Sequence, residues 1–465
     1  MTLPRLSLLL PVVLQLLGSA SALPSPAAVA DETPLWLRQA DAANSTSTSS
    51  AAESRSTPGF VNNGTIGSYD CSTSASSSSQ VSFSTVPGSG CVEAQPPVYP
   101  YNAINLRSSD DSIRATVLPY GSVVSELWVK DRYGGWRDVV LGFDNKTNYG
   151  TDTIHPNFSP IVGRYANRIK NGTFEVDGKT YKAPLNENNL DTLHGGDIGY
   201  DRSAYRVEEV KADEILLSHL DPDGFQGFPG EVKTYTRYRL LPDATWEIEL
   251  NATASKRTPL MLSSHVYWNL EAYNESQTIL DHVLHLPKAD KYVKTDTILI
   301  PTGELPTVEG TPYDFRTPHA FRDMFNETLG VCGFNCTGWD SCFVMTDPPK
   351  KREAKQQSVI ELSSLKSGIK LSVSASNQPA IQVYTCSGIN SPAKGSIPRK
   401  RSHGGDGTLD KVYDNYSCVV LEMEDYIDGI NNPQWGRDQI YGPDRPYHWR
   451  AKYSFSNIDE QGKAM

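Results

Sequence analysis

Two acid–base side chains stand inside runs of sequence that otherwise have the composition of buried strands. His265 lies in the stretch LMLSSHVYWNLEAYN, residues 260–274, and Glu422 directly follows the apolar run VVL. A buried imidazole or carboxylate must find a partner or take part in chemistry, because burial without a partner is costly. A carboxylate and an imidazole facing one ligand would suit general acid–base catalysis, in which each positioned group contributes about 10²–10⁴-fold.

Two further segments concentrate polar groups between apolar residues. The stretch GRYANRIKNG carries Arg164, Asn167 and Arg168, and TLHGG carries His194 ahead of two glycines. Each has a structural alternative. The arginines could form structural salt bridges, His194 could cap a turn, and His265 could be a core histidine with a hydrogen-bond partner. None of these segments decides alone between structure and chemistry.

A second carboxylate, Glu424, stands two residues after Glu422, so on a strand both project from the same face. If both point into one cleft, like charge raises at least one pKa, and the acid limb of an activity profile moves to higher pH. The alternative is an ion pair between Glu424 and Arg164 or Arg168. We favour this pairing, because an unpaired buried carboxylate is costly.

The elements that must position these residues are almost all strands. The Asp177-Gly178 and Pro242-Asp243 pairs each predict a hairpin turn between alternating runs. A short helix is expected only within residues 318–329. Many strands with frequent turns predict an all-β fold, a large antiparallel β-sandwich. Further strands are expected in EILLSHL, VLHLPKADKYV, GIKLSVSAS, AIQVYTCSG, SCVVLEMEDY and AKYSFS.

The N-terminal part of the chain differs in composition from the rest. A basic residue and an apolar run ahead of the small-residue motif ASA predict a secretory signal peptide over residues 1–22. Residues 23–95 are rich in Ser, Thr, Ala and Pro and predict a disordered leader. Residues 96–465 then predict one large domain. We therefore expect a secreted, extracellular protein, and the density of Asn-x-Ser/Thr acceptors predicts a glycoprotein.

Net charge and cysteine spacing argue against several classes of ligand and partner. The net charge of −11 argues against a nucleic-acid partner and against an anionic membrane surface. No apolar run after the signal is long enough to cross a bilayer. The seven cysteines follow no zinc-site spacing, and their odd number leaves one over in an oxidising compartment. The basic runs at residues 350–352 and 399–401 are interpreted as solvated loops, with dibasic processing sites as the alternative.

Taken together, the segments resemble the aldose 1-epimerases, also called galactose mutarotases. The resemblance covers about residues 100–455 and rests on the ordered motifs GRYANRI, TLHGG, DPDGFQGFPGE, SSHVYWNL, GTPYDFR, GWDSCF, NQPAIQVYT and LEMEDYIDGINNP. It implies the galactose mutarotase-like supersandwich, which is a large antiparallel β-sandwich. It also implies interconversion of the anomers of a small-molecule aldose, such as glucose or galactose, without cofactor or metal.

The same resemblance assigns roles to particular residues. Glu422 is expected to be the general base, His265 the general acid, and His194 a ligand of sugar hydroxyls that supports catalysis. Ring opening of a hemiacetal takes a proton from the C1 hydroxyl and gives one to the ring oxygen, so an acid–base pair suffices without a nucleophile. The residues expected to bind the sugar are Asn167, Arg168, Asp340 and Gln382.

The chain departs from the family pattern at several positions. Ser264 replaces an asparagine before the acid histidine, Trp268 replaces a phenylalanine, and Glu424 replaces a glutamine. An inserted basic loop occupies about residues 392–411. These departures leave the catalytic pair intact and bear on substrate range and efficiency.

Two other functions fit the same fold. The first is a polysaccharide-acting protein, which secretion would favour. The second is a carbohydrate-binding protein without turnover. An epimerase would speed the decay of optical rotation of fresh α-glucose and would release no new reducing ends. The sequence indicates neither an oligomeric state nor the preferred aldose.

Overall fold

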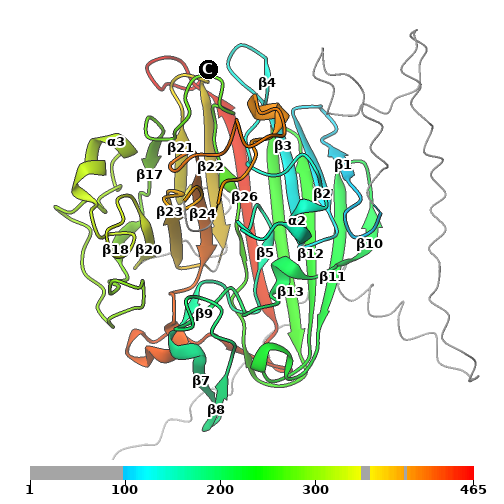
Figure 1. The fold of residues 1–465 in the computed structure, drawn as a ribbon, viewed down its shortest axis with the longest axis vertical. Coiled ribbons are helices and arrows are strands. Elements are labelled where there is room, and N and C mark those ends of the chain that lie inside the picture. Colours follow the sequence, from blue (N-terminus) through cyan, green and yellow to red (C-terminus); the bar gives the residue numbers. More distant parts are fainter. Residues whose placement is uncertain (1–97, 347–356, 377, 392–394) are drawn as a thin grey trace, which may run out of the picture. The chain divides into compact units, whose positions relative to one another are not determined.

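Antiparallel strands dominate the residues that the computed structural model describes, which are 98–346, 357–376, 378–391 and 395–465 (Figure 1). The predicted all-β sandwich is confirmed. The predicted signal peptide and leader, residues 1–95, and the basic run at residues 350–352 lie outside the described residues. None of the helices in the described part is long and apolar enough to span a bilayer.

The largest sheet has nine strands, and every pairing in it is antiparallel. Buried and more exposed side chains alternate along its long C-terminal strand, which buries every second side chain along most of its length. The strands in spatial order are β10 (Arg206–Val210), β11 (Glu214–Asp221), β12 (Val232–Leu241), β13 (Thr245–Ala254), β26 (Tyr447–Asn457), β22 (Ile369–Ser376), β21 (Ile360–Ser363), β17 (Val283–His285) and β19 (His319–Ala320).

Two smaller sheets cover this one. The five-stranded sheet has the order β16 (Tyr267–Trp268), β24 (Val419–Glu424), β23 (Ala380–Tyr384), β20 (Asp340–Met345) and β18 (Ala289–Tyr292). The four-stranded sheet has the order β1 (Ile104–Arg107), β2 (Ile113–Leu118), β3 (Val123–Lys130) and β4 (Trp136–Asp138). One continuous apolar core contains residues of all three sheets, among them Leu127, Trp246 and Leu421. The core therefore fills the space between the nine-stranded sheet and the other two.

Short elements complete the fold. The paired strands are β14 (Thr258–Pro259) with β25 (Ile440–Tyr441), β15 (Ser263–Ser264) with β5 (Ile161–Val162), β6 (Arg168–Ile169) with β9 (Thr192–Leu193), and β7 (Thr173–Val176) with β8 (Lys179–Lys182). The helices are α2 (Asn148–Thr151) and α3 (Phe321–Met324). The 3₁₀ turns are η1 (Lys170–Gly172), η2 (Tyr200–Arg202), η3 (Phe225–Gly227), η4 (Phe325–Glu327), η5 (Arg401–His403), η6 (Gly429–Asn431) and η7 (Pro433–Trp435).

The local signals of the sequence are confirmed. Asp177 and Gly178 both have positive φ and join β7 to β8, as a tight hairpin turn requires. The Pro242-Asp243 turn joins β12 to β13. The short helix expected within residues 318–329 is α3, which continues into η4. Disulfides link Cys332 to Cys336 and Cys386 to Cys418, while Cys342 is a buried free thiol.

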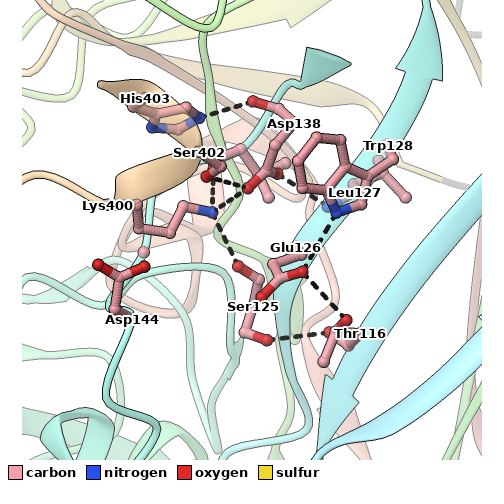
Figure 2. Close-up of polar contacts among 12 residues, drawn as sticks. Thr116, Ser125, Glu126, Leu127, Trp128, Asp138, Asp144, Lys400, Ser402 and His403 are labelled. Carbon is pink, nitrogen blue, oxygen red and sulfur yellow. Dashed lines mark hydrogen bonds and ion pairs between the residues drawn. The ribbon is translucent and has the colours of Figure 1, made fainter. Parts of the chain in front are cut away.

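The interpretation of residues 399–401 as a solvated loop is wrong at its central residue. Lys400 is almost fully buried, and its ammonium donates to the Asp138 carboxylate at 2.6 Å (Figure 2). The same ammonium reaches the carbonyl oxygens of Val140 at 2.8 Å and Ser125 at 3.0 Å. All three donors of the ammonium are thereby satisfied, which is what makes a buried lysine tolerable. Composition could not reveal this, because Asp138 lies far away in the sequence.

Candidate active site

The seven residues predicted to form a site line one cavity of about 240 Å³, here called the polar cavity. It lies over the five-stranded sheet, which supplies three of them, and the remaining four come from the segments around β6, β9 and β15. Its volume is below the roughly 300–1,000 Å³ of pockets for drug-sized ligands, so it suits a smaller molecule. The predicted residues in its lining are Asn167, Arg168, His194, His265, Asp340, Gln382 and Glu422.

Strand register places three polar groups side by side on the cavity floor. Gln382 on β23 lies directly opposite Glu422 on β24, and Asp340 begins the neighbouring strand β20. The Gln382 amide donates to the Asp340 carboxylate, which fixes the orientation of that amide. Within the described residues the Gln382 carbonyl oxygen and Glu422 Oε2 are buried without a hydrogen-bond partner. Both atoms are therefore available to a polar ligand.

His265 reaches the cavity from the irregular segment between β15 and β16. Two backbone hydrogen bonds hold this segment, from His265 N to Pro160 O and from Ser159 N to His265 O. The imidazole Nε2 lies 3.6 Å from Glu422 Oε1, and both side chains are almost fully buried. The sequence prediction that an acid and a base face one ligand therefore has the required geometry.

Burial shifts the two groups toward their uncharged forms. Desolvation lowers the pKa of His265 to about 4. Desolvation also raises the pKa of Glu422 well above its ordinary value, and the neighbouring carboxylates of Glu424 and Asp340 raise it further. Both shifts favour the uncharged forms, a protonated Glu422 beside a neutral His265. The pair holds one proton between them, which either group can carry once a ligand rebalances their environments.

His194 is a neutral hydrogen-bond donor to the cavity. Its Nδ1 accepts a hydrogen bond from the Asn167 backbone N–H at 3.2 Å, so its proton is on Nε2. Burial lowers the pKa of His194 well below its ordinary value, and the nearby His265 and Arg168 add to the effect. The glycine after it is obligatory, because a Cβ on Gly195 would lie 2.3 Å from a backbone oxygen. The glycine of the LHGG motif therefore lets the segment that carries His194 approach the segment that carries Asn167.

The expected ion pair of Glu424 with an arginine is wrong. Among the described residues its one side-chain hydrogen bond comes from Asn167 Nδ2, at 3.0 Å. Arg164 instead pairs with Asp221 in a buried structural salt bridge. Burial raises the pKa of Glu424 to about 8, with Asp425 and Asp340 adding like charge and the Asn167 hydrogen bond opposing the rise. The structure therefore favours the other arrangement considered for this pair, in which Glu424 raises the pKa of Glu422 by like charge.

Arg168 is the fixed cation of the cavity. Its guanidinium donates two hydrogen bonds to the Glu187 carboxylate, at 2.7 and 2.8 Å, and lies 3.7 Å from the Asp340 carboxylate. A third donation, at 3.3 Å, goes to Asn167 Oδ1. Such a bidentate pair fixes the plane of the guanidinium. The cavity thereby presents a charged donor and two carboxylate acceptors in fixed positions.

Sequence reasoning missed several residues of the cavity. Glu187, His155 and Asn157 all line it, and His155 is held by a 2.6 Å contact with Asp201. Asn157 belongs to one of the Asn-x-Ser/Thr acceptors, yet its Oδ1 is buried at the cavity without a partner among the described residues. Only the many polar residues before GRYANRI could have pointed to this segment. The partner of Arg168 could not be found without the tertiary structure.

None of the three substitutions relative to the family pattern is in the cavity lining. Trp268 is fully buried in the core against Trp246 and Tyr453. Ser264 lies on β15 and is also buried away from the cavity lining. Glu424 accepts a hydrogen bond from the side chain of a cavity residue, Asn167. Within the described ranges, no group of three or more His, Cys, Asp or Glu side chains could hold a metal ion.

Known proteins are similar to this chain in both sequence and fold. A family model described as aldose 1-epimerase matches residues 104–454. A probable aldose 1-epimerase of Arthroderma benhamiae is 38% identical over 361 residues, which cover 72% of this chain and 82% of that protein. A galactose mutarotase of Sus scrofa is 34% identical over 346 residues, covering 74% and 92%. The crystal structure of an aldose epimerase homologue from C. elegans superposes with a TM-score of 0.66 at 26% identity, covering 77% and 99%.

Proposed function

The chain belongs to the aldose 1-epimerase family, and from this premise we propose that Glu422 and His265 interconvert the α and β anomers of free aldohexoses such as glucose or galactose. The observation that carries the proposal is the contact of the two side chains, Nε2 to Oε1 at 3.6 Å, at the wall of the polar cavity. Both groups lie within reach of a ligand in the cavity, which is the geometric requirement for proton transfer.

The reaction needs only two proton transfers in each direction. Glu422 removes the proton of the C1 hydroxyl while His265 gives a proton to the ring oxygen, and the bond between C1 and the ring oxygen breaks. The open-chain aldehyde rotates about its C1–C2 bond and presents its other face. The same two groups then return their protons in the reverse sense, and the ring closes as the other anomer. No covalent intermediate with the protein is required.

The protonation states of the pair support this sequence. Ring opening converts a charged pair, carboxylate and imidazolium, into a protonated Glu422 and a neutral His265. Burial favours this uncharged pair, as the raised pKa of Glu422 and the pKa of about 4 for His265 indicate. The surroundings therefore stabilise the pair in the form that accompanies the open-chain aldehyde, which is the high-energy species of the reaction.

The remaining polar groups fit a ligand that is rich in hydroxyls. His194 offers an Nε2–H donor, Arg168 a charged donor, and Asp340 and Gln382 offer acceptor oxygens. Fixed donors and acceptors of both kinds match hydroxyl groups, each of which donates one hydrogen bond and accepts others. We assign these residues to sugar binding, and Asn167 with them.

Polarimetry of fresh α-glucose and α-galactose tests the proposal. We expect the wild type to accelerate the decay of optical rotation and to release no reducing ends from polysaccharides. Glu422→Gln should abolish the acceleration while sugar binding by calorimetry persists, because the amide keeps hydrogen bonding but cannot act as a base. The matched control is Glu361→Gln on β21, which does not line the cavity. Full activity of Glu422→Gln would refute the assignment, and binding without turnover by the wild type would indicate a carbohydrate-binding protein.

We further propose that the protein is exported and glycosylated. The support is the signal-like composition of residues 1–22 and the density of glycosylation acceptors. Expression in a eukaryotic secretory host, followed by N-terminal sequencing of the protein in the medium, tests this. A mature N-terminus at Leu23 and a mass decrease on treatment with an endoglycosidase are expected. Retention of the protein in the cells with an uncleaved N-terminus would contradict the proposal.

A further inference from the structure

The loop that Cys386 and Cys418 close is here called the disulfide loop; its described residues are 387–391 and 395–417, and it contributes to the lining of the polar cavity. Gly388 and Ile389 at its start are both in the cavity lining. The Tyr384 hydroxyl accepts a hydrogen bond from Gly388 N at 3.1 Å, which ties the loop to the end of β23. Ile389 is 4% exposed and belongs to a buried apolar cluster that joins the loop to residues of the sandwich, such as Phe158 and Tyr267.

The loop also supports a second isoleucine of the cavity. Ile154 belongs to a different segment, and it too lines the cavity. A Cβ placed on Gly395 of the disulfide loop would lie 3.3 Å from Ile154 Cδ1. The loop therefore lies next to Ile154. Both isoleucines line the cavity and pack with the same buried cluster, and together they are here called the apolar wall.

The side chains of this wall differ from the polar groups of the cavity. Ile154 and Ile389 offer no donor or acceptor, whereas the acid–base pair and the hydrogen-bonding groups occupy other parts of the lining, which also includes the apolar Pro156 and Leu193. A sugar turned toward the acid–base pair would bring carbon-bound hydrogens or a substituent against the wall. We infer that the disulfide loop is the substrate-selecting element: its Ile389, together with Ile154, restricts the cavity to unsubstituted monosaccharides and excludes aldoses that carry a second sugar unit. This inference rests on the proposed function.

The buried lysine described above anchors the loop. Lys400 reaches from the disulfide loop to Asp138 at the end of β4, and His403 Nε2 adds a 2.6 Å contact with the Asp138 carbonyl oxygen (Figure 2). On its other side His403 contacts the hydroxyl of Tyr413, whose ring belongs to the same buried cluster as Ile389. Lys400 is therefore a positioning residue that acts on the cavity through packed side chains.

Disaccharides with a free reducing end test the inference. For the wild type and for Ile389→Ala we would measure kcat/KM with glucose, galactose, maltose (1→4 linked) and melibiose (1→6 linked). We expect Ile389→Ala to raise the ratio of disaccharide to monosaccharide kcat/KM at least about 10-fold for one linkage, since single methylenes in apolar pockets discriminate 10–200-fold. The matched control is Leu409→Ala, an exposed residue of the same loop that does not line the cavity.

The outcomes separate this inference from the proposed function. A wild type without activity on monosaccharides would overturn the proposed function. A wild type that is active on monosaccharides, with ratios for Ile389→Ala within about 2-fold of its own for both linkages, would overturn the inference alone. Equal activity of the wild type on monosaccharides and disaccharides would do so as well.

A second pair of variants examines the anchor. Lys400→Met should raise the same ratio through KM rather than kcat, because the acid–base pair lies on other elements. The control is Arg401→Met. Arg401 is the next residue of the loop, and its side chain is 56% exposed, so its replacement should leave the ratio unchanged. Equal ratios for Lys400→Met and the wild type would remove Lys400 from the inference. If Lys400→Met does not fold, the Ile389→Ala comparison decides.

Discussion

Replacing Glu424 by glutamine should move the alkaline limb of the activity profile toward lower pH and leave the acid limb in place. The carboxylates of Glu422 and Glu424 share a strand face and both are almost fully buried. The pKa of Glu422 is raised and that of His265 is lowered to about 4, so the one-proton state of the pair spans the range between them. The acid limb of kcat/KM then reports His265, and the alkaline limb reports Glu422. This reverses the limb that the sequence alone suggested for Glu422.

The magnitude follows from the strand geometry. Two strand steps separate the carboxylates by about 6.5 Å. At an effective dielectric constant of about 20, a like charge at that distance contributes about 2.5 kcal/mol, or about 2 pKa units. Glu424→Gln keeps an oxygen that can accept from Asn167 and removes the charge. The alkaline limb should therefore move toward lower pH by at most about 2 pH units, because Glu424 itself carries its charge only as the pH approaches and passes its pKa of about 8, while the acid limb stays in place.

The pH dependence of the free energy of unfolding of the same variant tests independently whether folding raises the pKa of Glu424. The rise in the pKa of Glu424 from 4.5 to about 8 corresponds to about 5 kcal/mol at 1.36 kcal/mol per unit. Because the folded pKa is raised, this stabilisation is complete below pH 4.5 and is lost as the pH rises through about 8. The free energy of unfolding of the wild type should fall by several kcal/mol over that range relative to the variant. Parallel curves together with an unmoved alkaline limb would refute the coupling of the two carboxylates.

Two further predictions concern other parts of the chain. His265→Asn should lower kcat by at least about two orders of magnitude, as expected for loss of a general acid, and a change confined to KM would show that His265 only binds substrate. Deleting residues 23–95 should leave turnover and the melting temperature essentially unchanged, because that composition cannot form part of a core; a truncated protein that loses activity would show that the leader packs on the domain.

The sequence was informative where the signal is local. Alternation in β13 and β26, the turn at Asp177-Gly178 and the motif segments all predicted elements that the structure contains, because side-chain period and turn chemistry act over a few residues. Strand alternation also placed Glu422 and Glu424 on one face. The sequence failed where the outcome depends on a distant partner. Arg168 pairs with Glu187, and Glu424 receives its hydrogen bond from Asn167 rather than pairing with an arginine.

Lys400 shows why composition gave a wrong prediction of solvent exposure in the inserted loop. A run of three basic residues between Pro and Ser has the character of a solvated segment, and Arg401 is indeed exposed. The central lysine nevertheless contacts the Asp138 carboxylate at the end of β4 and the carbonyl oxygens of Ser125 within β3 and Val140 after β4, all more than 250 residues earlier. Breaking such a pair from one side costs about 3–5 kcal/mol, because it leaves the other charge buried alone. The loop is therefore anchored to the sandwich at Lys400 by a buried ion pair.

The acid–base pair and the apolar wall depend on one another. A protonated Glu422 beside a neutral His265 is favoured only while the cavity stays poor in water, since solvation would return each pKa toward its ordinary value. The side chains of Ile154 and Ile389 line the cavity and offer water no hydrogen-bond partner. Opening that wall should therefore do more than admit larger sugars. In Ile389→Ala we expect the alkaline limb, which reports Glu422, to move to lower pH and the acid limb, which reports His265, to move to higher pH, so that the profile of kcat/KM narrows from both sides. Limbs that stay in place in a variant that accepts disaccharides would show that the wall controls size alone.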